Sequence, residues 1–131
     1  MTHYLLDTNT VSYLFRSQGR VAEHLSALPV GTVSISAITE AELRYGLARN
    51  PSRRLHAAVD ELLARVGCLP WTSDTAQTYG TLRAALEKTG TTVALHDLLI
   101  AAHAHDTGAV LVTHDHVFDH IPGLTVEDWY E

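Results

Sequence analysis

The hydrophobic residues of this chain follow two patterns that alternate along the sequence. Short apolar or β-branched runs at residues 3–6, 32–35 and 109–112 predict buried strands. A brief extended segment is expected at residues 68–71, and a final strand around residues 124–126. Runs that are apolar on consecutive positions are typical of strands covered on both faces, which indicates a parallel sheet.

Between these runs the apolar residues recur every three or four positions, which predicts helices. The expected helices run from Thr10 to Phe15, from Arg20 to Leu28, from Thr39 to the Asn50–Pro51 break, from a Ser52 cap to Gly67, from Ser73 to Gly90, and from His96 to His105. Residues 113–120 are expected to form a polar loop. Strands that alternate with helices predict an α/β/α sandwich with a central, mostly parallel sheet of four to five strands.

The length and composition of the chain predict one domain. At 131 residues and 46% hydrophobic, residues 1–131 are long enough to bury a core without disulfides. The single Cys68 stands in an apolar context and is expected to be a small buried residue. No charged and then apolar leader is present, and no apolar stretch approaches the roughly 20 residues that span a bilayer. We therefore expect a cytoplasmic protein.

The net charge of −6 argues against a general polyanion binder. It leaves open that the excess acids gather at one site while arginines form a separate basic surface. Five arginines occur in the central segment, where a solvated helical face is their ordinary explanation: Arg44, Arg49, Arg53, Arg54 and Arg65.

Four acids stand at the ends of predicted strands or the starts of predicted helices: Asp7, Glu42, Asp97 and Asp115. Each also has an ordinary explanation. Asp7 is a good helix cap, Glu42 completes a capping box with Thr39, Asp97 suits a helix N-terminus, and Asp115 suits an Asx-turn. However, ligands of open parallel sheets gather beyond the carboxyl ends of the strands, so the four acids are expected at one rim.

A shared rim changes the interpretation of these acids. Two carboxylates about 5 Å apart repel by roughly 3 kcal/mol at an effective dielectric of about 20, so four ionised ones need a cation. Carboxylate oxygens are hard ligands that suit Mg²⁺ or Mn²⁺. Such an ion generates hydroxide near neutral pH, which makes phosphodiester cleavage the working hypothesis. Asn9 and Thr113 are candidates for orienting ligands or water.

The nine histidines offer a competing zinc site. Six of them crowd the last third of the chain: His96, His103, His105, His114, His116 and His120. Their spacing argues against zinc, since His103 and His105 are two apart on a predicted helix and point to different faces, and the single cysteine, Cys68, lies outside this segment. We expect solvated or core roles for most, while His96 and His114 adjoin the acids and are candidates to tune charge or contact phosphate.

Five ordered segments of the chain resemble the PIN-domain ribonucleases, and most closely the VapC toxins of toxin–antitoxin pairs. They are residues 5–9 (LLDTN), 35–46, 97–102 (DLLIAA), 111–118 and 121–129. The resemblance implies a Mg²⁺- or Mn²⁺-dependent endoribonuclease that cuts structured RNA such as tRNA or a ribosomal RNA loop and works as a homodimer. It assigns metal binding and water activation to Asp7, Glu42, Asp97 and Asp115. It also implies a cognate VapB-like antitoxin, a small DNA-binding protein whose C-terminal arm covers the site.

Two alternatives remain at this point. A phosphatase of the haloacid dehalogenase type also has an apolar strand that ends in an aspartate, but it requires a second aspartate where this chain has Asn9. A non-catalytic regulatory module would keep the fold without the chemistry, and the presence of all four acids argues against it.

Overall fold

The computed structural model, which describes residues 1–131, is organised around a five-stranded sheet in which every pair of neighbours is parallel. The strands are β1 (Tyr4–Leu6), β2 (Val33–Ser36), β3 (Gly67–Leu69), β4 (Val110–Val112) and β5 (Val126–Glu127). Their order across the sheet is β3-β2-β1-β4-β5, so the first strand lies in the middle. The predicted parallel α/β/α sandwich is confirmed.

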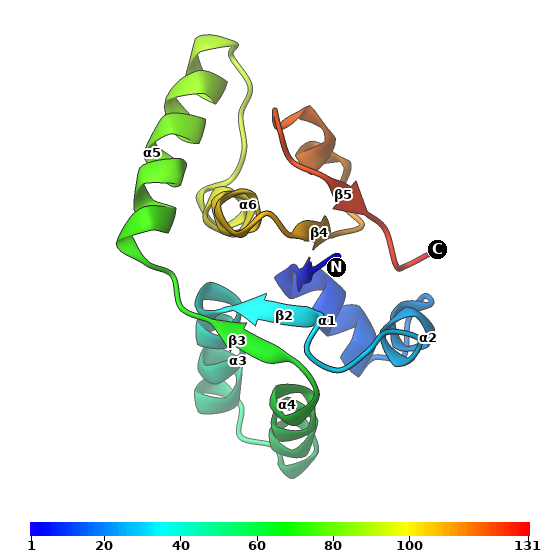
Figure 1. Cartoon of the computed structure of the whole chain (residues 1–131). Coiled ribbons are helices and arrows are strands. Elements are labelled where there is room, and N and C mark those ends of the chain that lie inside the picture. Colours follow the sequence, from blue (N-terminus) through cyan, green and yellow to red (C-terminus); the bar gives the residue numbers. More distant parts are fainter.

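Helices flank this sheet on both sides (Figure 1). They are α1 (Thr8–Phe15), α2 (Val21–Ser26), α3 (Ala37–Arg49), α4 (Arg53–Arg65), α5 (Ser73–Lys88) and α6 (Leu95–Thr107), with a 3-10 turn η1 (His116–His120). In Figure 1, α5 and α6 lie on one side of the sheet and α1, α2 and α4 on the other. None of these helices has both the length and the apolar character needed to cross a membrane.

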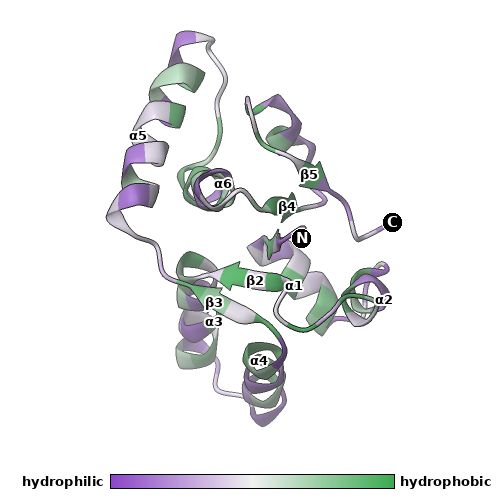
Figure 2. Cartoon of the chain, in the orientation of Figure 1, coloured by the Kyte–Doolittle hydropathy of each residue, from purple (hydrophilic) through white to green (hydrophobic).

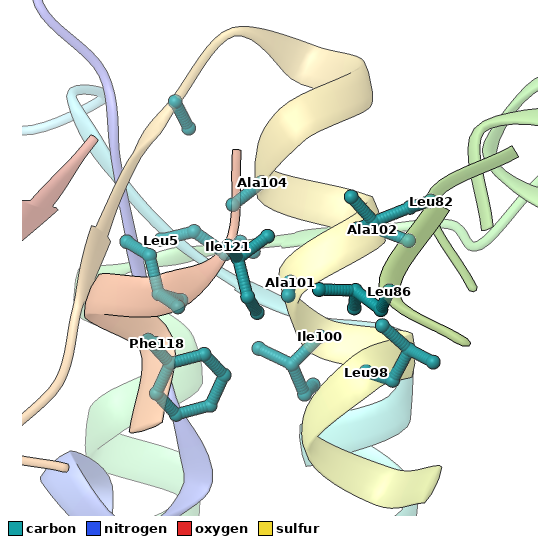
Figure 3. Packing of buried hydrophobic residues seen from close by; sticks show 12 residues of the cluster. Leu5, Leu82, Leu86, Leu98, Ile100, Ala101, Ala102, Ala104, Phe118 and Ile121 are labelled. Atoms are coloured by element: carbon teal, nitrogen blue, oxygen red, sulfur yellow. The ribbon is translucent and has the colours of Figure 1, made fainter. Parts of the chain in front are cut away.

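The two faces of β1 anchor two separate cores. Leu5 and Leu6 are both fully buried, and because neighbouring residues of a strand point to opposite faces, they join different clusters. Leu5 packs with Phe118, Ile121 and the inward residues of α5 and α6 (Figure 3). Leu6 packs in the cluster that also contains Trp129 and residues of α1, α2 and α4. Figure 2 shows the consequence, hydrophobic strands surrounded by helices of mixed character.

Four local predictions are wrong. Helix α3 begins two residues earlier than expected, because the Ser36 hydroxyl accepts a hydrogen bond from the Ile38 amide (3.1 Å) and caps it. Thr39 is therefore inside the helix and forms no capping box with Glu42. Cys68 is exposed, and its thiol donates to Glu40 (3.3 Å) instead of packing in a core. Part of the predicted polar loop forms η1, which Asp115 caps.

The C-terminal segment closes over the α1–α2 connection. Trp129 is buried, and the Tyr130 carbonyl accepts a hydrogen bond from the Arg20 amide (3.0 Å). Gly19 has φ +65°, and a Cβ on it would lie 2.7 Å from the Tyr130 carbonyl oxygen. This position therefore needs glycine both for its backbone angle and for the close approach of another backbone.

The substitution Gly19→Ala is expected to lower the free energy of unfolding by roughly 3 kcal/mol, because backbone strain and a backbone collision add. Gly108→Ala is the matched control, since Gly108 has φ +68° and a Cβ on it would meet nothing within 4 Å. That control should cost only about 1 kcal/mol. Urea unfolding curves measure both values, and equal losses would contradict the role given to the Tyr130 contact.

Candidate active site

Three of the four predicted acids line one pocket at the carboxyl edge of the sheet. Asp7 follows β1, Glu42 lies on α3 and Asp97 lies in the first turn of α6. The pocket has a volume of about 200 Å³, and its lining is completed by Thr8, Asn9, His96 and Ile100. Acids that are far apart in the sequence are brought together because parallel strands end at the same edge.

Asp7 is a helix cap and a pocket residue at once. Its Oδ1 accepts a hydrogen bond from the Thr10 amide (2.7 Å), and its own amide donates to the Val112 carbonyl (3.0 Å). Only 4% of the residue is exposed. Burial raises the pKa of Asp7 above its ordinary value, against the opposing effect of hydrogen bonds from Thr10 and Thr113, and the nearby Asp115 raises it further.

The other acids surround Asp7 with negative charge. Burial raises the pKa of Asp97, and the charges of Asp115 and Asp7 add to this, while His96 opposes it. Asp115 does not line the pocket, and its Oδ1 accepts from the Val117 amide (3.0 Å) as the predicted Asx-turn requires. The charge of Asp115 raises the pKa of both Asp7 and Asp97, and the charge of Asp7 raises the pKa of Asp97, so negative charges gather at this edge of the sheet.

A hydroxyl between three helices organises this pocket. The Thr8 Oγ1 lies 3.1 Å from the Thr39 Oγ1 and 3.1 Å from the His96 Nε2. The other ring nitrogen of His96, Nδ1, lies 3.9 Å from a carboxylate oxygen of Glu42. The Thr8 side chain of α1 thus connects Thr39 of α3 to His96 of α6. His96 in turn lies next to Glu42.

Sequence reasoning named His96 as a neighbour of the acids but missed Thr8 and Thr39. Two signals were available: Thr8 follows Asp7 directly, and Thr39 precedes Glu42 by one helical turn, which puts both on one face. The interpretation of Thr39 as a cap concealed the second signal. His114 takes a different role, since its Nδ1 bonds Asp128 (2.8 Å) and its ring stacks on Tyr130.

The two residues predicted to orient ligands lie beside the acids. Asn9 lines the pocket and is exposed. Thr113 is buried at the end of β4, and its hydroxyl accepts a hydrogen bond from the Asp115 amide (3.1 Å). Asn9 can therefore contact a ligand or water in the pocket, whereas Thr113 is placed to orient Asp7, with which its side chain forms a hydrogen bond.

The chemistry of this site suits a hard divalent cation. No three His, Cys, Asp or Glu side chains stand in a metal-binding arrangement, so the acids would have to reorient around an ion. The donors are carboxylate oxygens, the ligands that Mg²⁺ and Mn²⁺ prefer, and a cation would relieve the repulsion that raises the pKa of Asp97. The competing histidine site does not assemble, since His103 is buried in the core and His116 contacts Asp119 on the surface.

Comparisons with known proteins agree with this fold and site. The PIN domain profile matches residues 4–124. The tRNA(fMet)-specific endonuclease VapC of Salmonella typhimurium is 35% identical over 98% of this chain and 99% of its own length. Ribonuclease VapC2 of Haemophilus influenzae is 34% identical over 98% of this chain and 99% of its own. The chain therefore belongs to the PIN-domain family and, within it, to the VapC proteins.

Solved structures give the same result. VapBC2 from Rickettsia felis, bound to a DNA fragment from its promoter, superposes with a TM-score of 0.91 at 33% identity, covering 98% of this chain and 99% of that chain. DNA-bound VapBC from Salmonella typhimurium superposes with a TM-score of 0.90, also at 33% identity, covering 98% and 99%. These matches confirm the resemblance seen in the sequence. The chain is therefore not a phosphatase of the haloacid dehalogenase type.

A buried histidine supports the site from behind. His103 of α6 is fully buried, and its Nδ1 lies 2.7 Å from the hydroxyl of Ser36, the residue that caps α3. Burial lowers the pKa of His103 below its ordinary value, which outweighs the opposite effects of the Asp106 carboxylate and the Pro70 carbonyl. The neutral ring therefore joins the two helices that carry Glu42 and Asp97.

This burial predicts a pH dependence of stability. Below about pH 6.5, His103 becomes protonated in the unfolded chain but stays neutral in the folded chain. The free energy of unfolding should therefore fall as the pH decreases. His103→Asn should flatten that slope between about pH 7 and pH 5 in urea unfolding. The exposed His116→Asn is the control and should leave the slope unchanged. Equal slopes for His103→Asn and the wild type would contradict a neutral buried ring.

Proposed function

We propose that this chain is a Mg²⁺- or Mn²⁺-dependent endoribonuclease toxin that a VapB-like antitoxin inhibits. The observation that carries the proposal is the pocket where the buried Asp7 and the half-buried Asp97 lie with Glu42 at the carboxyl edge of the sheet. Membership in the VapC proteins supports ribonuclease activity. The acid-rich pocket supports the finer proposal that a divalent metal ion takes part.

Each predicted site residue has a proposed role, including Asp115 and Thr113, which lie outside the lining of the pocket. Asp7, Glu42, Asp97 and Asp115 would hold the ion, which supplies hydroxide and neutralises charge on the scissile phosphate. The hydrogen bond from the Thr10 amide fixes one oxygen of Asp7, so its carboxylate is oriented before anything binds. The Thr8 hydroxyl holds the ring of His96, whose other nitrogen lies 3.9 Å from a carboxylate oxygen of Glu42. Asn9 and Thr113 orient ligands or water.

The relatives indicate the substrate and partners to test. The Salmonella relative is named as specific for tRNA(fMet), so structured RNA such as tRNA or ribosomal RNA is the proposed substrate class. The two solved structures described above are DNA-bound VapBC complexes, so a DNA-binding VapB-like antitoxin is the proposed partner. A homodimer completes the proposed assembly.

Asp7→Asn should reduce RNA cleavage at least about a hundredfold, because metal-assisted stabilisation is worth several kcal/mol. Asparagine caps helices as well as aspartate does, and it avoids burying an ionised carboxylate, so the variant should fold at least as stably. Sequencing of new RNA 5′ ends measures the activity, and Asp74→Asn on the surface of α5 is the control. Cleavage that persists in Asp7→Asn would overturn the assigned chemistry. An inactive wild type would favour the non-catalytic module.

Metal binding has a test that does not depend on RNA. After EDTA treatment, millimolar Mn²⁺ should raise the melting temperature by several degrees, since a ligand that binds only the folded state stabilises it. The double variant Asp7→Asn with Asp97→Asn should lose this shift, while Asp74→Asn keeps it. If the wild type melts at the same temperature with and without Mn²⁺, the acids do not form a cation site.

A further inference from the structure

The exposed edge of α3 extends from the pocket to the α3–α4 turn. Glu42, Tyr45 and Arg49 are spaced by three and four residues, so they lie along one side of the helix. Tyr45 and Arg49 follow Glu42 by about 4.5 Å and about 10.5 Å along the helix axis. Tyr45 is 60% exposed, one of the few large hydrophobic side chains of this chain that face solvent. An aromatic ring thus stands in solvent one turn from the pocket.

The positive charges of the chain are distributed unevenly. Three of the nine lysines and arginines form ion pairs with acids: Arg20, Arg44 and Arg83. Arg65 donates to the carbonyls of Leu25 and Leu28. Of the remaining five, none has an acid within ion-pair distance, and three stand together at the α3–α4 turn: Arg49, Arg53 and Arg54.

Two of these three arginines, Arg53 and Arg54, are held at an electrostatic cost, whereas Arg49 lies in the last turn of α3, where the helix dipole favours a cation. Arg53 and Arg54 are the first residues of α4, where the positive end of the helix dipole disfavours cations, and the first turn contains no acid. Arg49 closes the preceding helix only a few residues away. A polyanion bound at the turn would relieve this repulsion. Arg44 neutralises Glu40 nearby, so that carboxylate does not cancel the cluster.

We propose that this edge of α3 binds the unpaired nucleotides next to the cleaved phosphodiester, an inference that rests on the proposed ribonuclease function. Tyr45 stacks on a base, and Arg49 binds a phosphate with Arg53 and Arg54 extending the contact. Aromatic rings and arginines are the side chains that recognise single-stranded RNA. The net charge of −6 and the acids of the pocket both repel RNA. A local cluster of cations beside the pocket would offset this repulsion and attract the phosphates.

RNA accounts for these residues better than a protein partner does. A standard protein interface buries about 800 Å² on each partner. Tyr45 is the only large exposed hydrophobic side chain of α3, since Met1 and Val30 belong to other segments and Leu95 precedes His96 at the start of α6. RNA binding needs no apolar patch: the Tyr45 ring can stack on a base, and the arginines beside it can contact phosphates.

The test measures binding of a fluorescein-labelled RNA of about ten nucleotides to the Asp7→Asn protein, which should bind without cutting. Adding Tyr45→Ala should weaken binding of the single strand about tenfold, and Tyr45→Phe should restore it because the ring is kept. A duplex of the same sequence should lose little with Tyr45→Ala. Adding Arg49→Gln should lower the slope of log K against log salt by roughly one.

Lys88→Gln is the matched control for loss of charge, because Lys88 closes α5, whose end lies opposite the α3–α4 turn in Figure 1. Single-strand binding that is unchanged by both Tyr45→Ala and Arg49→Gln overturns the inference, even if the wild type cleaves RNA. The inference is also wrong if Tyr45→Ala weakens binding of the antitoxin alone. If binding depends on Tyr45 but the wild type does not cleave, this inference stands and the proposed function fails.

Discussion

The structure depends on the position of β1 in the middle of the sheet. This strand has only three residues, yet it pairs with β2 on one side and β4 on the other, and Leu5 and Leu6 anchor the cores on the two faces. A strand that is paired along both edges and packed on both faces has little freedom to move. Asp7, the next residue, is therefore fixed at the sheet edge, and α1 begins from its carboxylate.

Burying Asp7 carries a cost that the rest of the fold has to offset. Desolvation and the charge of Asp115 disfavour its ionised form, while the Thr10 amide and the Thr113 hydroxyl favour it. A chain selected for stability alone would place a neutral cap here, because asparagine serves a helix N-terminus equally well. The repulsion among Asp7, Asp97 and Asp115 is thus best explained by the cation proposed to bind there.

Two hydrogen-bonded contacts hold the helices that carry the other acids. In the pocket, Thr8 connects Thr39 of α3 with His96 of α6. Behind it, His103 of α6 contacts Ser36 at the start of α3. Glu42 and Asp97 therefore project from helices whose relative position is set twice, by one contact near the solvent and one in the core. Such a support keeps an open, charged pocket in shape before it binds anything.

The sequence by itself determined the elements, the parallel sheet and the rim where the four acids were expected, because these follow from local periodicity and from the rule that parallel strands end at one edge. Only the tertiary structure decided which side chains meet. Thr8 contacts residues 31 and 88 positions away, and the capping box expected for Thr39 was replaced by one of those contacts. Cys68 was predicted to be buried because its neighbours are apolar, but β3 is an edge strand and leaves it exposed. Hydrophobic patterns record which face of an element is buried, and a hydrogen bond between elements depends on how those faces are brought together.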